Sequence, residues 1–391
     1  MNTQKLPPRT ARVGGPIPLT APDLRGNEAV YLNACIAENW VSSAGRFVGE
    51  MERRMATLIG RGHGVATVNG TAALHLALIA AGVEPGDRVL VPDWTFGATA
   101  NAVYHAGAQP YFIDVTHATW TLDPDLVAQA LADPANRIRA VIAVHALGHP
   151  ADLDPIGDCC ATAGVALIED VAGALGARYR SRAAGAFGAF AVFSFNGNKT
   201  VTAGGGGMVV TDDGASARRM RRLSTQARSG HGYRHEEVGF NYRMTNLNAA
   251  VGLAQLERLD EMLAAKRAIA QAYDQALAGR SDLKPMPRAE WAESSCWLYS
   301  VLCGSPPDAE ALVAHLDARS VEARVFWISL SAQAPFALAP RLLTGAAAAL
   351  SGRVVSLPSS SGLGAGEQRR VVEALAAWQG STDVEAIWTS S

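Results

Sequence analysis

The stretch AVFSFNGNKTVTAGGGGM, residues 191–208, places a lysine shortly after an apolar run. The run ends at Phe195, and Lys199 follows in a polar turn flanked by glycine. Lys199 is the only lysine between Lys5 and Lys266, in a chain where arginine supplies nearly all of the positive charge. Lysine can lose its proton and act as an amine nucleophile, whereas arginine cannot. The stretch therefore predicts a strand followed by a candidate reactive amine, although a lone turn lysine is usually only solvated.

A second apolar run, Val165–Asp170, ends on two adjacent carboxylates. A buried strand that finishes in Glu-Asp is costly unless the acids meet a cation or hydrogen-bond donors. Asp170 is therefore a candidate partner for a protonated ring nitrogen of a cofactor. The alternative is an acid that faces solvent or caps the next helix.

Residues Asn69, Gly70 and Thr71 precede an apolar helical stretch, Thr71–Ala81. The free N–H groups of such a helix start, with the Thr71 hydroxyl, can bind an anion such as a cofactor phosphate. An ordinary N-cap is equally consistent with this pattern. The glycine run Gly204–Gly207 lacks GxGxxG spacing and leads into a strand, which argues against a nicotinamide-dependent oxidoreductase.

Short apolar runs alternate with helical segments over residues 60 to 215. The predicted strands are Arg88–Pro92, Gln109–Val115, Arg139–His145, Val165–Asp170, Phe187–Phe195 and Gly207–Thr211. Pro124–Ala132 is one predicted helix, with Asp123 as its N-cap. This alternation predicts an α/β fold with a mostly parallel sheet sandwiched by helices, and ligands at the carboxyl ends of its strands.

The alternation of predicted strands and helices ends at about Asn246. Asn248–Ala278 predicts one long helix, and the remainder predicts a smaller α+β domain. Its expected strands are Cys296–Leu302 and Val321–Ile328, and its expected helices are Asp308–Ala318 and Glu367–Trp378. We expect a large domain at 15–255, a small domain at 256–380 joined to it by the long helix and the N-terminal segment, and a flexible tail at 381–391.

Composition narrows the class of protein. The chain of 391 residues is 49% hydrophobic and 18% charged, with a formal net charge of −2. This balance favours neither nucleic acid nor a membrane as a partner. Five scattered cysteines and an N-terminus without an apolar core predict a cytoplasmic protein without disulfides. His231 and His235 do not share a helix turn because glycine surrounds His231, so no metal site is expected.

The sequence also resembles a known family in many stretches and in the family's order. These include NGTAALHLAL (69–78), GDRVLVPDWTFGATANAV (86–103), IEDVAGALGA (168–177), FSFNGNKTVTAGGGGM (193–208) and GFNYRMTNLNAAVGLAQLE (239–257). They are similar to the DegT/DnrJ/EryC1/StrS sugar aminotransferases, which are fold-type I enzymes dependent on pyridoxal 5'-phosphate. The resemblance implies that fold, that cofactor and an aminotransferase.

The resemblance also implies roles for individual residues. Lys199 would hold the cofactor as a Schiff base and move the proton, and Asp170 would hold the pyridine nitrogen. Phe96 would stack on the ring, whereas Trp94 is expected to pack in the core. The phosphate contacts would be Thr71, Ala72 and Ser194, with Asn241 entering from a second subunit of an obligate homodimer. The resemblance further implies that His231, Tyr233 and Trp327 bind the substrate.

The implied reaction moves an amino group from L-glutamate to C4 of a nucleotide-linked 4-keto-6-deoxy sugar. Residues 224–246 are most similar to transaminases of UDP-linked N-acetylated sugars, and residues 195–208 also resemble perosamine synthases, which use a GDP-linked sugar. We favour UDP-2-acetamido-2,6-dideoxy-4-keto-hexose, on a route to a deoxyamino sugar of a polysaccharide. A non-catalytic regulatory protein with the same fold is the alternative of another class.

Three positions depart from the family pattern. Gly173 stands where glutamine, glutamate or histidine is common, Gly205 replaces a common glutamate, and the usual VHLYG is VHALG at 144–148. A polar neighbour of the cofactor is therefore expected to be missing at Gly173.

Overall fold

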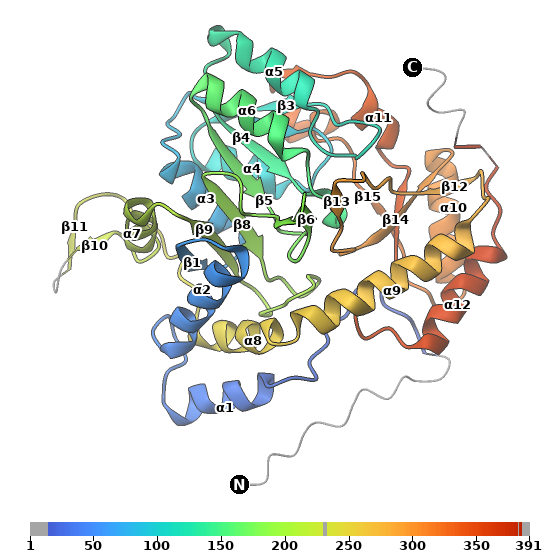
Figure 1. Cartoon of the computed structure of the whole chain (residues 1–391), viewed down its shortest axis with the longest axis horizontal. Helices are drawn as coiled ribbons and strands as arrows, with labels where there is room; N and C mark the ends of the chain where they lie inside the picture. Colours follow the sequence, from blue (N-terminus) through green and yellow to red (C-terminus); the bar gives the residue numbers. More distant parts are fainter. Residues whose placement is uncertain (1–14, 230–232, 382, 385–391) are drawn as a thin grey trace.

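A large sheet forms the centre of the computed structural model, which describes residues 15–229, 233–381 and 383–384 (Figure 1). In order across the sheet, the strands are β1 (His63–Thr67), β9 (Gly207–Thr211), β8 (Phe190–Ser194), β5 (Ala166–Asp170), β4 (Ile138–Val144), β2 (Arg88–Pro92), β3 (Gln109–Ile113) and β16 (Arg341–Leu342). Only β9 runs against its neighbours β1 and β8, and every other pair is parallel. The predicted mostly parallel α/β sheet is therefore confirmed.

Helices cover both faces of this sheet. One face carries α3 (Gly70–Ala80), α4 (Ala98–His105) and α7 (Gly214–Leu223), and the other carries α2 (Arg46–Ile59), α5 (Pro124–Ala132), α6 (Leu153–Ala163) and α8 (Asn246–Leu256). Helix α1 (Glu28–Ala37) packs on α8. Successive side chains of a strand alternate between faces, so Val89 and Val91 enter one core layer while Leu90 enters the other. This explains the uninterrupted apolar strands.

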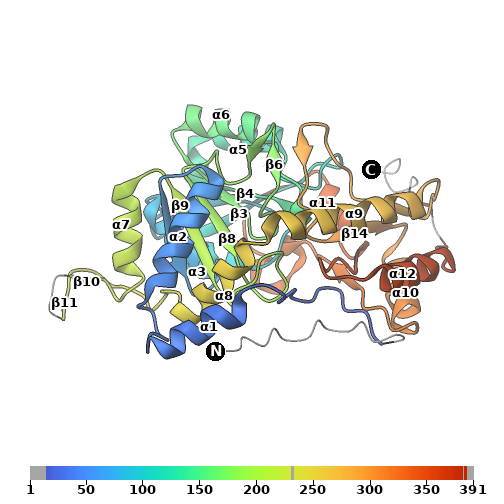
Figure 2. The same ribbon diagram turned by 60° about the horizontal axis from the view of Figure 1, so that its bottom comes forward.

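A second sheet lies beside the first and is antiparallel throughout. Its order is β12 (Leu283–Pro285), β14 (Tyr299–Cys303), β17 (Val354–Leu357) and β15 (Arg324–Phe326). Helices α9 (Leu259–Leu277), α10 (Pro306–Asp317) and α12 (Ala365–Ala376) pack against it. Figure 2 shows α9 running from the α8 end of the molecule to this second sheet.

Small elements complete the fold. They are the strands β6 (Arg178–Tyr179), β7 (Arg182–Ala183), β10 (Arg228–Ser229), β11 (Arg234–His235) and β13 (Ala292–Glu293), the helix α11 (Ala346–Leu350), and four short 3₁₀ helices at Pro134–Asn136, Ala146–Gly148, Leu330–Ala332 and Ala334–Phe336. None of the helices that the structure describes is long and apolar enough to cross a membrane. The division at residue 255 stays a prediction, and β16 returns from beyond it to pair with β3.

The predicted element bounds hold best where a local signal marks them. Strands β2 and β9 and helix α5 have the predicted bounds, and Asp123 caps α5 by accepting from the N–H groups of Asp125 and Leu126. The prediction of a single helix over Asn248–Ala278 is wrong, because α8 ends at Leu256 and α9 begins at Leu259. Arg258 leaves helical geometry in between, with φ −109° and ψ 10°, and pairs with Asp23 and Glu261.

The strand predicted over Cys296–Leu302 begins three residues late, at Tyr299. Cys296 has φ +51°, which is left-handed geometry that a strand does not accommodate. Cys296 and Trp297 therefore belong to a turn before β14, and this turn reaches toward the large sheet.

Glu169, at the end of β5, is completely buried and has its full set of partners. One carboxylate oxygen accepts from the N–H groups of Phe187 and Gly188, each at 2.7 Å. The other accepts from the Gly185 N–H at 2.7 Å and faces His145 Nε2 at 3.2 Å. Burial by itself would raise the pKa of Glu169, but the hydrogen bond and charge of His145 and the main-chain donors bring it below its usual range. Glu169 thus fixes the loop before β8 to the end of β5.

We expect Glu169→Gln to destabilise the fold by about 2–4 kcal/mol, because an amide NH₂ group would then face main-chain donors in a buried site. The measurement is denaturant unfolding at neutral pH, with Glu237→Gln as the control. Glu237 pairs with Arg222 near the surface at 2.6 Å, and its loss should cost less than about 1 kcal/mol.

The effect of Glu169→Gln should also depend on pH. The pKa of Glu169 is lower in the folded chain than its ordinary value of 4.5, so its stabilisation is complete above that pH and declines as the pH falls further. The gap between wild type and variant should narrow below about pH 4.5. An equal cost for both variants, or a gap that widens in acid, would contradict this role.

Candidate active site

Asp170 lies at the carboxyl end of β5, buried beneath α4. One carboxylate oxygen accepts from the Thr99 hydroxyl at 3.1 Å, and the other accepts from the Ala172 N–H at 3.1 Å. Burial raises the pKa of Asp170, while the Ala172 N–H, the charge of Lys199 and the Thr99 hydroxyl oppose that rise. Within the described chain no cation makes a hydrogen bond or ion pair with this carboxylate. Its site is therefore suited to a cationic partner that the chain itself does not supply.

Lys199 lies in the turn that follows β8, the strand next to β5. Its N–H donates to the Asn196 carbonyl at 3.0 Å, which closes the turn. The ammonium nitrogen lies 3.7 Å from the ring centroid of Trp297. Burial lowers the pKa of Lys199 to about 8, although the charge of Asp170 acts to raise it. Lys199 and Asp170 thus form an electrostatically coupled pair at one edge of the sheet.

The start of α3 lies at the same edge. Asn69 is its N-cap, and its side chain accepts from the Ala72 N–H at 2.8 Å. Ser194, the last residue of β8, lies against Gly70, where an added Cβ would come within 3.0 Å of the Ser194 Cβ. Thr71, Ala72 and Ser194 are therefore gathered around one helix N-terminus, as a phosphate site requires.

The glycine run has a structural role at this helix start. A Cβ on Gly207 would lie 2.4 Å from the Asn69 carbonyl oxygen. Only glycine at position 207 therefore lets β9 run this close to the N-cap of α3. Gly205 is different, because its nearest neighbour would be the Val68 oxygen at 3.8 Å. Nothing in the structure explains why glutamate is absent at 205.

The predicted aromatic residues occupy different environments. Phe96 follows β2, and its side chain is 65% exposed in the single chain. Trp94 is buried, as expected for a packing residue, and its Nε1 donates to the Trp327 carbonyl at 3.1 Å. Phe96 is thus the aromatic whose ring is free for stacking, while Trp327 lies beside the buried Trp94.

Two further predicted residues are exposed in the single chain, and a third lies outside the described residues. Tyr233 is almost fully exposed on the β10–β11 hairpin, which projects from the body in Figures 1 and 2. Asn241 is exposed and its backbone bridges to Thr225. His231 lies outside the described residues. This arrangement leaves the hairpin and Asn241 available to another molecule.

Sequence reasoning missed two residues of the site, Thr99 and Trp297. Thr99 lies in α4, which packs on β2 and β3, and its hydroxyl reaches Asp170 at the end of β5 only in the folded chain. Trp297 comes from the second sheet, nearly a hundred residues beyond Lys199. No local signal in the sequence identifies either contact.

Comparison with known proteins places the whole chain in a family. The sequence profile of the DegT/DnrJ/EryC1/StrS aminotransferase family matches residues 22–376. A Caulobacter vibrioides protein named GDP-perosamine synthase is 40% identical over 92% of this chain and 97% of its own length. EpsN of Bacillus subtilis, described as a candidate pyridoxal phosphate-dependent aminotransferase, is 37% identical over 95% of this chain and 98% of its own.

Solved structures give the same result. The sugar aminotransferase CalS13 from Micromonospora echinospora superimposes with a TM-score of 0.84 at 29% identity, over 93% of this chain and all of its own. Fold and sequence therefore give the same family. The chain belongs to the DegT/DnrJ/EryC1/StrS aminotransferase family and is a pyridoxal-phosphate-dependent sugar aminotransferase.

Proposed function

We propose that the chain transfers the amino group of L-glutamate to the C4 keto carbon of a GDP-linked 4-keto-6-deoxy hexose, with Lys199 and Asp170 as catalytic residues. The observation that carries this proposal is the coupled pair itself. A buried carboxylate without a cationic hydrogen-bond partner among the described residues lies beside an amine whose pKa is lowered to about 8. Such perturbed pairs at strand ends are typical of active sites.

Asp170 is suited to hold a protonated ring nitrogen. The Thr99 hydroxyl and the Ala172 N–H fix its two oxygens, which leaves the carboxylate charge to stabilise a cation. An opposite charge within this buried site would reverse the rise in the pKa of Asp170 and keep it ionised. When bound, pyridoxal phosphate supplies a carbonyl carbon that amines attack and a conjugated ring that withdraws electrons from the carbon losing a proton.

Lys199 is suited to two tasks. With a pKa of about 8, an appreciable fraction of its amine is neutral near pH 7, and the neutral amine is the nucleophile that attaches the cofactor. Once released by the amino donor, the same nitrogen can take a proton from one carbon and return it to another. Both tasks need an amine that changes protonation state easily, which an ordinary surface lysine does not provide.

Thr71, Ala72 and Ser194 would hold the cofactor phosphate, and Phe96 would stack on its ring. The Ala72 N–H already donates to the Asn69 side chain, so a phosphate would compete with Asn69 for this donor. The Thr71 and Ser194 hydroxyls flank the same helix start and add donors that need no rearrangement of the backbone.

The choice of sugar nucleotide rests on the relatives. The sequence pattern of residues 224–246 favours a UDP-linked N-acetylated sugar, whereas the similar protein from Caulobacter vibrioides is named for GDP-perosamine. Because that similarity spans 92% of the chain, we give the GDP sugar precedence over a match confined to one segment. The UDP sugar is the second candidate.

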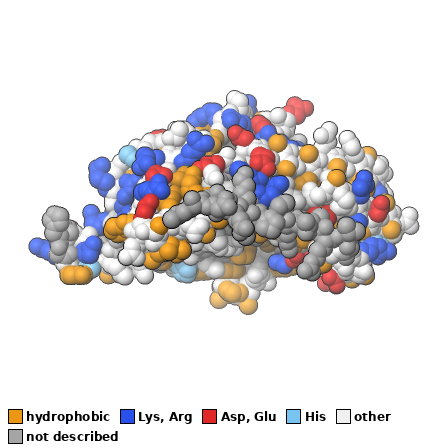
Figure 3. Space-filling model, turned by 90° about the horizontal axis from the view of Figure 1, so that it is seen from below, with side chains coloured by type: hydrophobic (Ala, Val, Ile, Leu, Met, Phe, Trp, Pro, Cys, Tyr) orange, Lys and Arg blue, Asp and Glu red, His pale blue; other side chains and the backbone are white. Residues whose placement is uncertain are grey.

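We further propose a cytoplasmic homodimer in which Asn241 and Tyr233 enter the partner's site. Figure 3 views the molecule from the α1 side and shows apolar side chains beside charged ones on that surface. Helix α1 and the adjoining loops carry the exposed apolar residues Leu24, Val30, Ile36, Trp40 and Val41, which are 46–65% exposed. Exposed apolar patches of this kind are typical of subunit interfaces.

Lys199→Ala should abolish the visible absorption band of a lysine-bound cofactor and reduce turnover by at least about a thousandfold. Lys284→Ala is the matched control and should keep both. The rate at which the cofactor-free wild type takes up pyridoxal phosphate should rise with pH around a midpoint near 8, because only the neutral amine attacks. A colourless wild type would support a non-catalytic protein instead.

Turnover with L-glutamate should be fastest with the GDP-linked 4-keto-6-deoxy hexose in a panel that also contains UDP-linked N-acetylated and dTDP-linked keto sugars. The measurement is kcat/KM for each acceptor at one glutamate concentration. Preference for the UDP sugar by tenfold or more would replace the GDP assignment while leaving the aminotransferase intact.

Analytical ultracentrifugation should find a dimer that retains activity, and Trp40→Glu should weaken it by placing a charge in the apolar patch. Asn241→Ala should lower affinity for pyridoxal phosphate without changing the oligomeric state. A fully active monomer would exclude shared sites.

A further inference from the structure

Trp297 belongs to the turn before β14 in the second sheet, yet its indole lies in the candidate active site of the first. The ring is 4% exposed, and its centroid lies 3.7 Å from the Lys199 ammonium nitrogen. The indole Nε1 donates to the Asn198 carbonyl at 2.8 Å, so the ring is also bonded to the residue next to Lys199. Trp297 therefore contacts both the side chain and the turn that carry the amine.

Gly173 is glycine because the same indole fills its side-chain space. A Cβ built on Gly173 would lie 2.6 Å from Cε3 and 2.9 Å from Cζ3 of Trp297, distances that real Cβ atoms do not reach. Gly173 is not among the positive-φ glycines, so its backbone would tolerate a side chain. The missing polar residue after the Glu-Asp pair is thus explained by an aromatic ring brought from elsewhere in the chain.

The turn that carries Trp297 is anchored to the ends of β4 and β5. The Ser295 N–H donates to the Gly148 carbonyl at 3.0 Å, and the Ser295 hydroxyl contacts the Gly173 carbonyl at 3.4 Å. The buried Lys266 of α9 donates to the Trp297 carbonyl at 3.1 Å.

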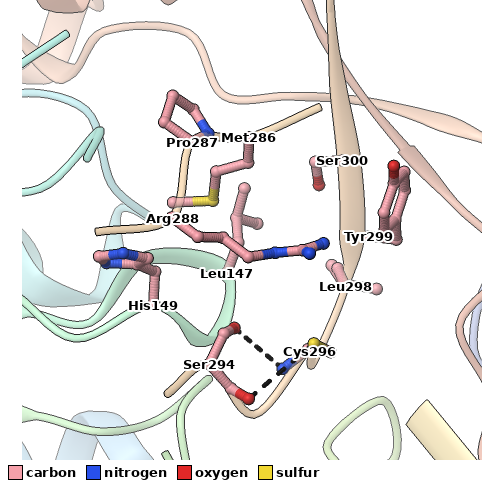
Figure 4. Close-up of a pocket in the computed structure, with 10 residues that line it drawn as sticks. All are labelled: Leu147, His149, Met286, Pro287, Arg288, Ser294, Cys296, Leu298, Tyr299 and Ser300. Carbon is pink, nitrogen blue, oxygen red and sulfur yellow. Dashed lines mark hydrogen bonds between the residues drawn. The ribbon is translucent and has the colours of Figure 1, made fainter. Parts of the chain in front are cut away.

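Figure 4 shows the turn beside a pocket between the two sheets, with Cys296 held by the Ser294 hydroxyl at 3.0 Å. These bonds fix the backbone around Trp297, and the Nε1 bond to the Asn198 carbonyl holds the indole itself.

We propose that Trp297 is a positioning residue for Lys199 and that Gly173 and Trp297 act as one coupled unit, in which the indole takes the place of a polar side chain. The proposal rests on the role of Lys199 in the proposed function. The indole limits the conformations of the lysine side chain and excludes water from one side of the amine, while Asp170 is the charged group that acts on it from β5.

Two effects of the indole on Lys199 oppose each other. Its ring face attracts the protonated amine, and its bulk removes water that would solvate the charge. Burial is the larger influence on this lysine, because the pKa is lowered in spite of Asp170. Removing the ring should therefore admit water and raise the pKa toward that of an ordinary lysine.

The first test compares Trp297→Leu and Trp297→Phe. In Trp297→Leu, the midpoint pH for uptake of pyridoxal phosphate by the cofactor-free protein should rise by about one unit. Its kcat should fall about tenfold or more, with KM for the sugar nucleotide changed much less, because the amine is misplaced while the sugar is still bound. Trp297→Phe keeps a ring face and should recover most of both losses.

Trp378→Leu is the matched control, since it likewise removes a buried indole but from the core of the second sheet, away from Lys199. It should lower thermal stability without moving the midpoint or kcat.

The second test is a double-mutant cycle. Gly173→Ala should displace the indole and reproduce much of the kcat loss in the wild-type background, but it should change Trp297→Leu less than about twofold. Additive effects, or an unmoved midpoint in Trp297→Leu, would overturn the proposal. Failure of the proposed function would be seen separately, as an absorption band that survives in Lys199→Ala.

Discussion

Two adjacent carboxylates at the end of β5 impose the constraint on which the site depends. Successive side chains of a strand point to opposite faces, so Glu169 and Asp170 each enter a different buried layer. Glu169 is matched by three main-chain N–H groups and His145. Asp170 receives only a hydroxyl and one N–H. The first carboxylate is therefore satisfied by the chain itself, whereas the second has fewer partners among the described residues and is the one proposed to meet the cofactor.

Much of the fold could be predicted because its signals are local. Runs of apolar residues identified β2, β5 and β9, and a proline after Asp123 identified the start of α5. The break between α8 and α9 has no such signal. It coincides with an ion pair between Arg258 and Asp23, residues far apart in the sequence. Strand β16, on the edge of the large sheet, could not be predicted from the sequence either, because it forms by pairing with the distant strand β3.

The residues of the candidate site also differ in whether a local sequence pattern identifies them. Lys199, Asp170 and the start of α3 each follow a recognisable strand or precede a recognisable helix. Thr99 and Trp297 reach the site through packing alone. Gly173 could be recognised as a departure from the family pattern, but its cause could not, because the space that it leaves is filled from residue 297. A missing side chain in a motif is thus a reason to look for its replacement elsewhere in the fold.

A lowered pKa does not by itself identify the reactive lysine. Burial lowers the pKa of Lys266 to about 8, the same value as for Lys199. The nitrogen of Lys266, however, is committed to the carbonyls of Trp297 and Ser359, and its side chain is almost completely enclosed. The nitrogen of Lys199 makes no hydrogen bond within the described chain. It lies over the ring of Trp297, and the charge of Asp170 acts on it. The two lysines therefore have similarly lowered pKa values but differ in whether their nitrogen is already bonded, and the proposed attachment of a cofactor to Lys199 needs an unbonded amine.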